Sequence, residues 1–254
     1  MSSFNGKVVL ITGTARGCGA VLAAAFAEAG ATVVACDVDA EAGTKTAGKI
    51  AEAGGQIDFS TADVAREEDV EALVARTLES HGRLDCAINN AGTEELSEIA
   101  DGTESAFDEL IATDLKGLFF CLKHEIRAMR QGGGGAILNM SSVTSSITAA
   151  PANGLYAATK GGVNGLTKAA AIEVGKDNIS VNALAFAAID IPGSMIWRYL
   201  DEQKVPVEAL MQAFPVGRMG RPDELVAAAM YLCSDDARFC TGTTLILDGG
   251  FTAQ

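Results

Sequence analysis

Short apolar runs rich in valine and isoleucine alternate along the chain with longer amphipathic segments. This alternation is typical of repeated strand–helix units, and a helix between consecutive strands requires parallel pairing with right-handed crossovers. The sequence therefore predicts one α/β domain over residues 1–254, a Rossmann-like doubly wound parallel sheet with helices on both faces. The predicted strands are 7–12, 32–37, 56–63, 84–92, 136–142, 179–185 and 243–250, and the predicted helices are 21–30, 40–53, 67–82, 104–130, 156–174, 193–213 and 222–234.

Glycines are concentrated in TGTARGCG, residues 12–19, which joins the first predicted strand to the first predicted helix. In a doubly wound sheet, ligands bind beyond the carboxyl ends of the strands. Gly13, Gly17 and Gly19 permit a tight turn and let backbone N–H groups and a helix N-terminus approach an anionic pyrophosphate. The stretch predicts a dinucleotide-binding turn that includes Cys18. A glycine-rich turn without a ligand is the alternative.

Asp37 closes the second predicted strand and bears on which dinucleotide would bind. An acid near this position accepts hydrogen bonds from the adenosine ribose and repels a 2′-phosphate, which favours NAD. Arg16, in the glycine-rich turn, favours NADP because a guanidinium can hold a 2′-phosphate. The carboxylate of Asp37 would face that phosphate directly, so we expect NAD, with NADP less favoured.

Tyr156 and Lys160 are spaced i and i+4 within GLYAATKGG, residues 154–162, a run of mostly small residues. Residues at this spacing are neighbours on a helix surface. An ammonium beside a phenol favours the phenolate, so we expect Lys160 to lower the pKa of Tyr156 from its reference value of about 10. The phenol could then act as a general acid or base. The alternative is a tyrosine lying over a lysine stem on an ordinary surface helix.

Charge and composition argue against other classes of function. The formal net charge of −14 and the pI near 4.5 oppose a nucleic-acid or anionic-membrane surface. No apolar stretch approaches the roughly 18 residues of a membrane helix, and we expect no targeting signal at the start of the chain. The cysteines form no C-x-x-C pair, so we expect no metal site and reduced thiols in the cytoplasm. Sequence spacing suggests no acidic partner for His81 or His124, which opposes a Ser-His-Asp triad.

Several motifs occur in a particular order along the chain. They are T-G-T-A-R-G-C-G at 12–19, D-V at 63–64, N-N-A-G at 89–92, N-M-S-S at 139–142, Y-A-A-T-K at 156–160, and P-V-G-R and L-I-L-D-G-G between 215 and 250. With this set the chain resembles the short-chain dehydrogenase/reductase family, in its branch of single-domain enzymes of this length. The resemblance covers essentially the whole chain. It implies hydride transfer between a nicotinamide cofactor and a substrate carbon, and a homotetramer.

The resemblance assigns cofactor contacts to residues at the strand ends. Asp63 would hydrogen-bond the adenine amino group, with Val64 beside the ring. Asn90, Ala91 and Gly92 would line the cofactor's ribose.

The resemblance also assigns the catalytic groups. Tyr156 would be the general acid/base, Lys160 would bind the nicotinamide ribose hydroxyls and lower the pKa of the phenol, and Ser142 would hydrogen-bond the substrate oxygen. Ser141 is the alternative donor, because the spacing from Ser142 to Tyr156 is longer than the family's commonest spacing. Asn89 would brace the central strands.

Two segments depart from the family's pattern. In I-A-T-D-L-K-G, Asp114 stands where the family usually has an asparagine whose backbone carbonyl helps to hold a water linked to the lysine. The carbonyl is retained, and we expect Asp114 to take part in catalysis and to find donors or share charge with Lys160, since a buried carboxylate without partners is costly.

The second departure follows the predicted strand 179–185. Phe186, Ala187 and Ile191 stand where the family has Pro-Gly and a threonine that hold the nicotinamide. We expect Ile189 to offer backbone hydrogen bonds to the carboxamide, and Phe186 to pack on the nicotinamide or narrow the substrate pocket.

Substrate clues come from an apolar stripe that includes Trp197. We expect residues 187–214 to form a substrate lid; a subunit contact is the alternative. A lid lined in this way favours a neutral ketone or secondary alcohol over a phosphorylated sugar. Glu94 and Glu95, after the N-N-A-G turn, would discourage anionic substrates if they face the pocket.

The function predicted is an NAD-dependent oxidoreductase that interconverts a neutral secondary alcohol and the corresponding ketone. One alternative is an NADPH-dependent 3-oxoacyl or ketone reductase, favoured only by Arg16. Another is a non-catalytic dinucleotide-sensing regulator, suggested by the two departures. The intact Ser142, Tyr156 and Lys160 oppose this second alternative, because a sensor needs no proton donor.

Overall fold

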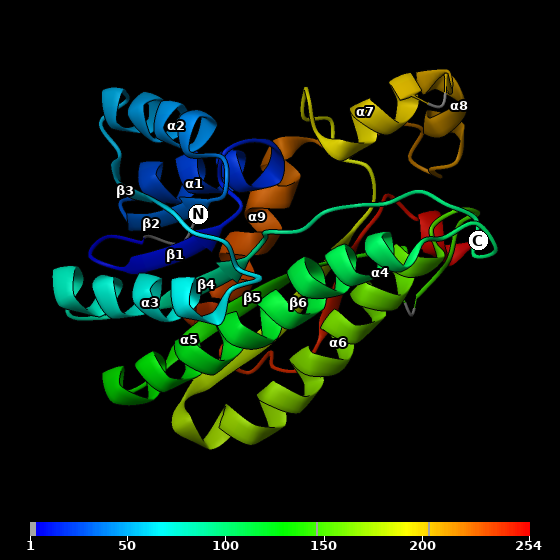
Figure 1. Ribbon diagram of the computed structural model, residues 1–254. Helices are drawn as coiled ribbons and strands as arrows, with labels where there is room; N and C mark the ends of the chain where they lie inside the picture. Colours follow the sequence, from blue (N-terminus) through cyan, green and yellow to red (C-terminus); the bar gives the residue numbers. More distant parts are fainter. Residues whose placement is uncertain (1–3, 146, 203) are drawn as a thin grey trace.

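A parallel sheet runs through the computed structural model, which describes residues 4–145, 147–202 and 204–254. Within these residues seven strands pair in the order β3-β2-β1-β4-β5-β6-β7, with helices on both faces (Figure 1). The predicted Rossmann-like α/β fold is confirmed. The strands are β1 (Val8–Thr12), β2 (Thr32–Asp37), β3 (Gln56–Thr61), β4 (Cys86–Asn89), β5 (Gly135–Ser142), β6 (Ile179–Phe186) and β7 (Thr244–Leu247).

Helices α1, α2 and α9 lie on one face of the sheet, and α3, α5 and α6 lie on the other (Figure 1). None of the helices in the described part of the chain is long and apolar enough to span a membrane. The α-helices are α1 (Gly17–Glu28), α2 (Ala40–Glu52), α3 (Glu67–His81), α4 (Glu104–Leu110), α5 (Leu118–Gly132), α6 (Gly154–Val174), α7 (Met195–Glu202), α8 (Val207–Gln212) and α9 (Pro222–Cys233).

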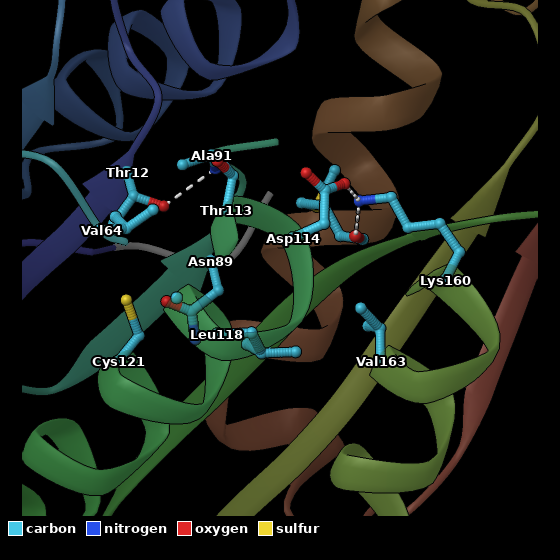
Figure 2. Close-up of a pocket in the computed structure, with 12 residues that line it drawn as sticks. Thr12, Val64, Asn89, Ala91, Thr113, Asp114, Leu118, Cys121, Lys160 and Val163 are labelled. Carbon is cyan, nitrogen blue, oxygen red and sulfur yellow. Dashed lines mark hydrogen bonds and ion pairs between the residues drawn. The ribbon is translucent and has the colours of Figure 1, made fainter. Parts of the chain in front are cut away.

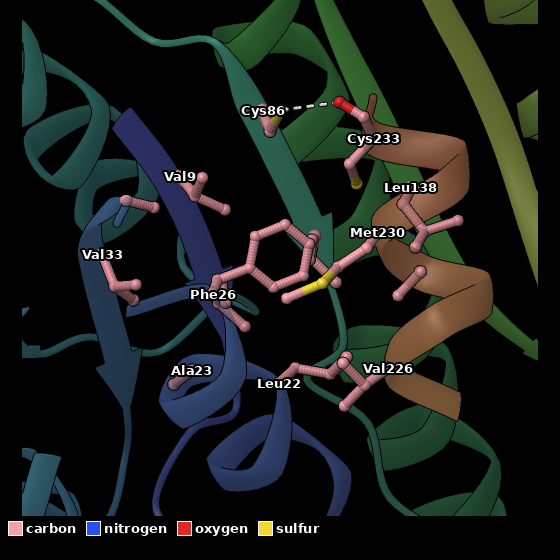
Figure 3. Close-up of a cluster of buried hydrophobic side chains, with 14 of the residues drawn as sticks. Val9, Leu22, Ala23, Phe26, Val33, Cys86, Leu138, Val226, Met230 and Cys233 are labelled. Carbon is pink, nitrogen blue, oxygen red and sulfur yellow. Dashed lines mark hydrogen bonds between the residues drawn. The ribbon is translucent and has the colours of Figure 1, made fainter. Parts of the chain in front are cut away.

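Successive residues of β1 pack into opposite helical layers because side chains alternate along a strand. Figure 3 shows Phe26 of α1 and Met230 of α9 on the side of the sheet that Val9 faces. Leu10, the next residue, packs in the opposite layer with Leu73 of α3. Each large side chain buried in this way contributes about 1.5–3 kcal/mol. Burial on both faces explains why the strands read as continuous apolar runs.

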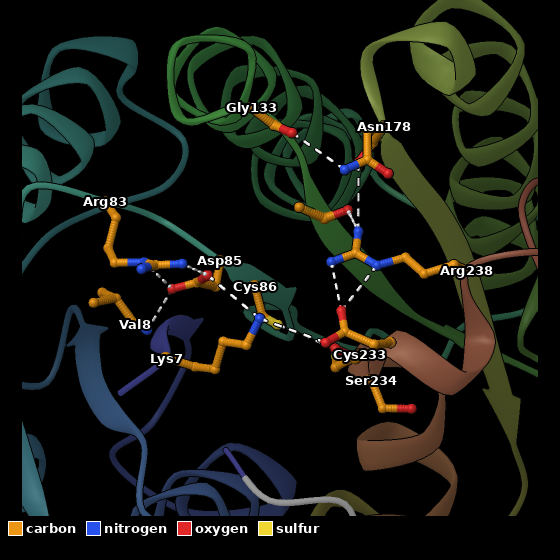
Figure 4. Close-up of polar contacts among 12 residues, drawn as sticks. Lys7, Val8, Arg83, Asp85, Cys86, Gly133, Asn178, Cys233, Ser234 and Arg238 are labelled. Atoms are coloured by element: carbon orange, nitrogen blue, oxygen red, sulfur yellow. Dashed lines mark hydrogen bonds and ion pairs between the residues drawn. The ribbon is translucent and has the colours of Figure 1, made fainter. Parts of the chain in front are cut away.

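Ion pairs and hydrogen bonds close the amino-terminal edge of the sheet (Figure 4). The Asp85 carboxylate accepts hydrogen bonds from the Val8 N–H at 2.9 Å and from Arg83 Nε at 2.8 Å. Arg238 donates to the Gly135 carbonyl at 2.7 Å. These contacts fasten the starts of β1, β4 and β5 at the edge opposite the glycine-rich turn.

The winding of the sheet reverses at β1, which pairs with β2 on one side and β4 on the other. The chain adds β2 and β3 in one direction and then crosses back to β4, β5, β6 and β7. The connections that follow β1 and β4 therefore run in opposite directions and leave a crevice at the carboxyl ends of these strands. A crevice at this position binds ligands in doubly wound sheets. The glycine-rich turn follows β1, and the N-N-A-G turn spans the end of β4.

The predicted helix 104–130 is interrupted at its centre. Helix α4 ends at Leu110, a π-helical segment spans Ile111–Gly117, and α5 follows. Amphipathic periodicity did not reveal this segment. Its last residue, Gly117, packs so closely that a Cβ there would lie 2.9 Å from a Val64 methyl group. Wide helical turns of this kind occur frequently at functional sites.

The predicted helix 193–213 is instead two short helices, α7 and α8, and residue 203 lies outside the described residues. Pro206 precedes α8 with an extended backbone, and a proline at this boundary cannot donate to a preceding helical turn. The first helix begins at Gly17, earlier than predicted, because the glycine-rich turn leads directly into it.

Candidate functional site

The glycine-rich turn packs its backbone tightly between β1 and α1. Gly13 has a φ of +71°, and a Cβ on Gly19 would lie 1.9 Å from the Gly13 carbonyl oxygen. Both positions therefore require glycine. Among the described residues no side chain caps the start of α1 at Gly17, and its first turn carries no acid. Its free N–H groups fit the pyrophosphate of a nicotinamide dinucleotide.

Cys18 lies at the start of α1 with its side chain packed against the core. Burial raises the pKa of its thiol to about 11, so the thiol stays protonated near neutral pH. The sequence placed Cys18 in the binding turn, and the structure leaves the backbone of this residue, rather than its sulfur, suited to contact a ligand.

Thr12 ties the two turns of the crevice together. Its hydroxyl oxygen accepts a hydrogen bond from the Ala91 N–H at 2.9 Å (Figure 2). It accepts another from the Asn90 N–H at 3.0 Å. In return, the Asn90 side-chain amide donates to the carbonyls of Thr12 and Gly13 at 3.0 and 2.9 Å. Sequence reasoning included Asn90 and Ala91 but missed Thr12, although it opens the T-G-T-A-R-G-C-G motif.

Asp37 ends β2 beside the glycine-rich turn. Its carboxylate accepts hydrogen bonds from the N–H groups of Ala15 at 2.9 Å and Asp39 at 3.0 Å. Each carboxylate oxygen has a further lone pair, so Asp37 can still accept from a ribose hydroxyl. The Arg16 side chain is 71% exposed and lies 3.9 Å from the Asp39 carboxylate.

Asp63 and Val64 lie across the crevice, after β3. One Asp63 oxygen accepts a hydrogen bond from the Ala65 N–H at 2.9 Å, which fixes the turn. Val64 is buried against Cys121 of α5. The two residues thus border the crevice on the side where the resemblance expects the adenine.

A buried ion pair joins α6 to the π-helical segment (Figure 2). Lys160 Nζ lies 3.1 Å from Asp114 Oδ2, with only 8% and 0% of the two side chains exposed. Lys160 also donates to the Met140 carbonyl at 3.3 Å, and the other Asp114 oxygen accepts from the Thr93 N–H at 2.8 Å. Asp114 therefore has both the donor and the shared charge that its burial was expected to require.

Tyr156 lies buried in the first turn of α6 beside Lys160, whose Nζ is 5.5 Å from the ring centroid. The Ser142 side chain lies near the phenol and favours its ionised form, which lowers the pKa of Tyr156. The structure thus brings Ser142, Tyr156, Lys160 and Asp114 together, next to the crevice formed by the two turns.

Ser141 faces a different environment. Its hydroxyl donates to the Asn164 side-chain carbonyl at 2.8 Å, whereas Ser142 accepts from the Thr144 N–H at 3.1 Å and contacts Tyr156. Adjacent strand residues face opposite sides, so Ser142 and not Ser141 shares the side of the phenol.

Burial is the largest influence on the phenol, and it raises the pKa of Tyr156 above its ordinary value. The charge of Lys160 acts in the opposite direction but is outweighed, and the charges of Glu94 and Asp114 add to the increase. Lys160 thus lowers the pKa as expected, but the sequence did not reveal the burial that outweighs this contribution. Burial opposes the charged form of Lys160, yet the charges of Asp114 and Tyr156 raise its pKa overall.

Phe186 ends β6 and lies opposite Ser142 in the strand register. Its side chain is half-buried, and its carbonyl accepts a hydrogen bond from the Val143 N–H at 3.3 Å. The Ala187 N–H donates to the Leu247 carbonyl at 3.1 Å. Phe186 is thus held beside the serine that the resemblance assigns to the substrate.

Ile189 is buried, and its carbonyl accepts a hydrogen bond from the Ile191 N–H at 2.8 Å. Trp197, in α7, donates from its indole nitrogen to the Asp190 carboxylate at 3.1 Å. These contacts tie α7 to the segment that leaves β6.

Asn89, which the resemblance assigns to bracing the central strands, begins a polar chain beneath the crevice whose other members sequence reasoning missed. Asn89 donates to Glu125 of α5 at 2.9 Å and to Asn139 at 3.0 Å, and Asn139 donates to Thr167 at 2.9 Å. Glu125 is fully buried, and its second oxygen has no hydrogen-bond partner within the described residues. Burial raises the pKa of this carboxyl to about 7. A glutamate on an amphipathic helix gives no sequence signal for such a role.

Both histidines have acidic partners that sequence spacing did not suggest. His81 lies 2.9 Å from Asp58, and His124 lies 3.1 Å from Glu67. These pairs join α3 to β3 and to α5, away from Ser142. The described residues contain no cluster of histidine, cysteine and acidic side chains able to hold a metal.

Comparison with known proteins places this architecture in a family. Residues 13–252 match the family model described as enoyl-(acyl carrier protein) reductase. The chain is 38% identical to 2,5-dichloro-2,5-cyclohexadiene-1,4-diol dehydrogenase of Sphingobium indicum, over 100% of both chains. The chain belongs to the short-chain dehydrogenase/reductase family and is an oxidoreductase that acts on CH–OH groups.

Solved structures agree with this assignment. Levodione reductase superimposes with a TM-score of 0.93 at 34% identity, covering 98% of this chain and 99% of that chain. A gluconate 5-dehydrogenase from Burkholderia cenocepacia J2315, in complex with NADP and tartrate, gives a TM-score of 0.92 at 33% identity, covering 99% and 97%.

Proposed function

We propose that this protein interconverts a neutral secondary alcohol and the corresponding ketone with NAD, using Tyr156 as the general acid/base. The observation that carries the proposal is the assembly of a buried phenol, its Ser142 partner and the Lys160–Asp114 pair beside a dinucleotide-type crevice. A pure sensor of dinucleotides would need the crevice but not this proton-transfer group.

The side chains around the substrate oxygen have separate roles. The Ser142 hydroxyl and the Tyr156 phenol bind that oxygen, which orients the reacting carbon. During oxidation Tyr156 takes the proton of the alcohol, and during reduction it returns a proton to the ketone oxygen. Lys160 stabilises the phenolate, and Asp114 holds Lys160 in place. Nicotinamide dinucleotide, when bound, accepts or supplies the hydride.

The cofactor would lie across the carboxyl ends of β1, β2 and β4. The N–H groups at the start of α1 would bind the pyrophosphate, and Asp37 would accept from the adenosine ribose. NADP is the second candidate, because Arg16 is exposed beside this position and a relative of known structure holds NADP. Asp37 and Asp39 together would repel a 2′-phosphate, which favours NAD.

The substrate class follows from the surroundings of Ser142. Half-buried Phe186 and Trp197 offer apolar surface, and the segment 187–214 would act as the lid. The names of two relatives, a cyclohexadiene-diol dehydrogenase and levodione reductase, support a neutral alcohol or ketone.

A homotetramer of single-domain chains is part of the proposal. Large apolar side chains are exposed on two separate surfaces: Ile172 of α6 is 85% exposed, and Phe239, beyond α9, is fully exposed. Burying these side chains in subunit contacts would remove their apolar surface from water. Light scattering coupled to size-exclusion chromatography measures the mass directly, and a monomer would contradict this part.

The test follows nicotinamide absorbance with NAD and with NADP over a panel of neutral secondary alcohols and ketones. We expect turnover with NAD that collapses in Tyr156→Phe. Tight binding of NAD without turnover of any panel member would favour the sensor. Turnover only with NADPH would favour the reductase alternative.

A further inference from the structure

The segment after the N-N-A-G turn lies directly against the reactive centre. A Cβ on Gly92 would lie 3.0 Å from Asp114 Oδ2 and 3.3 Å from Lys160 Nζ. The Thr93 N–H then donates to the other Asp114 oxygen at 2.8 Å. Glu94 is the next residue, so its backbone is positioned by the buried ion pair.

Glu94 is half-buried and lines a pocket of about 200 Å³ with polar residues of α4 and the segment before it. Its charge acts on both Tyr156 and Lys160. Arg198 and Glu202 of α7 are the charged groups that act on it from the expected lid. Glu94 is therefore within electrostatic reach of both the reactive phenol and α7.

The charge of Arg198 favours the ionised form of Glu94 without a direct contact. Among the described residues none donates a hydrogen bond to it and none forms an ion pair with it. Burial raises the pKa of this carboxyl. Removing a carboxylate from water without a compensating hydrogen bond is unfavourable, and a donor on a bound substrate would remove that cost.

We propose that Glu94 is a specificity-determining residue that accepts a hydrogen bond from a second hydroxyl of the substrate, so that the substrate is a diol or polyol. This inference rests on the proposed function, in which Tyr156 and Ser142 bind the reacting oxygen. A hydroxyl donating to a carboxylate forms a charge-assisted hydrogen bond. The same carboxylate disfavours an anionic group at that position of the substrate.

The test compares cyclohexanol with cyclohexane-1,2-diol, which differ by one hydroxyl, as substrates of the parent and of Glu94→Leu. We expect kcat/KM for the diol to fall by roughly tenfold to a hundredfold, the effect of losing a hydrogen bond to a charged group. The Glu94 charge also raises the pKa of Tyr156, so each kcat/KM is measured at the pH optimum of its variant. For cyclohexanol we then expect a change within about threefold, because that substrate never made the contact. Glu94→Gln keeps a hydrogen-bond acceptor but loses the charge, so its kcat/KM for the diol should lie between those of the parent and of Glu94→Leu.

Glu95→Gln is the matched control, because Glu95 is the exposed neighbour in the same pocket. It changes the net charge by the same amount and should leave the ratio of the two kcat/KM values unaltered. Thermal unfolding of each variant shows whether it is folded. A third substrate, 2-aminocyclohexanol, carries an ammonium in place of the second hydroxyl.

Equal losses for cyclohexanol and the diol in Glu94→Leu, or an unchanged ratio, would overturn the assignment of Glu94 while leaving the proposed function standing. A loss confined to 2-aminocyclohexanol would overturn it in favour of a cationic substrate. If the parent turned over no member of the wider alcohol and ketone panel, the proposed function itself would fail, and the role of Glu94 with it.

Discussion

Asp114 Oδ2 lies 3.1 Å from Lys160 Nζ, and this pair is closed off from solvent. The negative charge offsets part of the positive charge that Lys160 presents to Tyr156, and it raises the pKa of the phenol. The substitution of Asp for the family's usual Asn thus has an electrostatic consequence at the reacting group.

We expect Asp114→Asn to shift the pH dependence of alcohol oxidation. Oxidation requires the phenolate, and removing a negative charge near the phenol lowers its pKa. The rising limb of kcat against pH should therefore move to lower pH. Asp108→Asn, an exposed change on α4, is the control. An Asp114→Asn profile that overlaid the parent's would show that this charge has no part in proton transfer.

Tyr156→Phe should lower kcat by at least about a hundredfold, the usual contribution of a general acid or base. Binding of NAD, measured by calorimetry, should weaken little, because the glycine-rich turn and Asp37 are untouched. Tyr231→Phe makes the same change on α9, away from Ser142, and should retain activity. Substantial turnover by Tyr156→Phe would require another proton donor.

Asp37→Ser should change cofactor preference. The variant loses the carboxylate that would bind the ribose and repel a 2′-phosphate, while Arg16 remains beside the position. We expect the ratio of kcat/KM with NADP to that with NAD to rise by about tenfold or more. Asp58→Ser on β3 serves as the control. An unaltered ratio would mean that Asp37 does not discriminate between the two cofactors.

Glu125→Gln should stabilise the protein at alkaline pH. Burial raises the pKa of Glu125 from 4.5 to about 7, so the folded state holds a proton that the unfolded chain releases near pH 4.5. The unfolded state then binds fewer protons in this window, and the free energy of unfolding falls as pH rises through it. Above pH 7 Glu125 is ionised in the folded state as well, and its burial then lowers the free energy of unfolding by on the order of 3 kcal/mol at most.

Denaturant unfolding of the parent and Glu125→Gln at pH 5 and pH 8 measures this effect. We expect the free energy of unfolding of the variant to exceed that of the parent by more at pH 8 than at pH 5. Glutamine cannot ionise, and its side-chain oxygen can still accept a hydrogen bond from Asn89. Equal differences at the two pH values would show that Glu125 does not titrate between them.

The sequence alone predicted the fold, because the features that specify it are local. Continuous apolar strands separated by amphipathic helices permit only parallel pairing. The turns that contain the candidate site residues follow these strands, so they lie at the carboxyl ends of the strands. The spacing of Tyr156 and Lys160 likewise predicted their proximity, since it is a property of one helix. Asp114 was identified from the resemblance, because it stands where the family usually has an asparagine.

Only the tertiary structure determined the burial, the contacts and the pKa shifts of these side chains. The net direction of the Tyr156 pKa depends on how completely neighbouring elements remove water from the phenol, which no spacing reveals. Glu125 and Glu94 read as ordinary acids until packing buries one and places the other beside the reactive centre. Gly117 of the π-helical segment packs closely against Val64, a contact between residues far apart in the chain. The burial of a side chain and its long-range contacts depend on residues that are distant in the chain. A local sequence pattern therefore predicts neither.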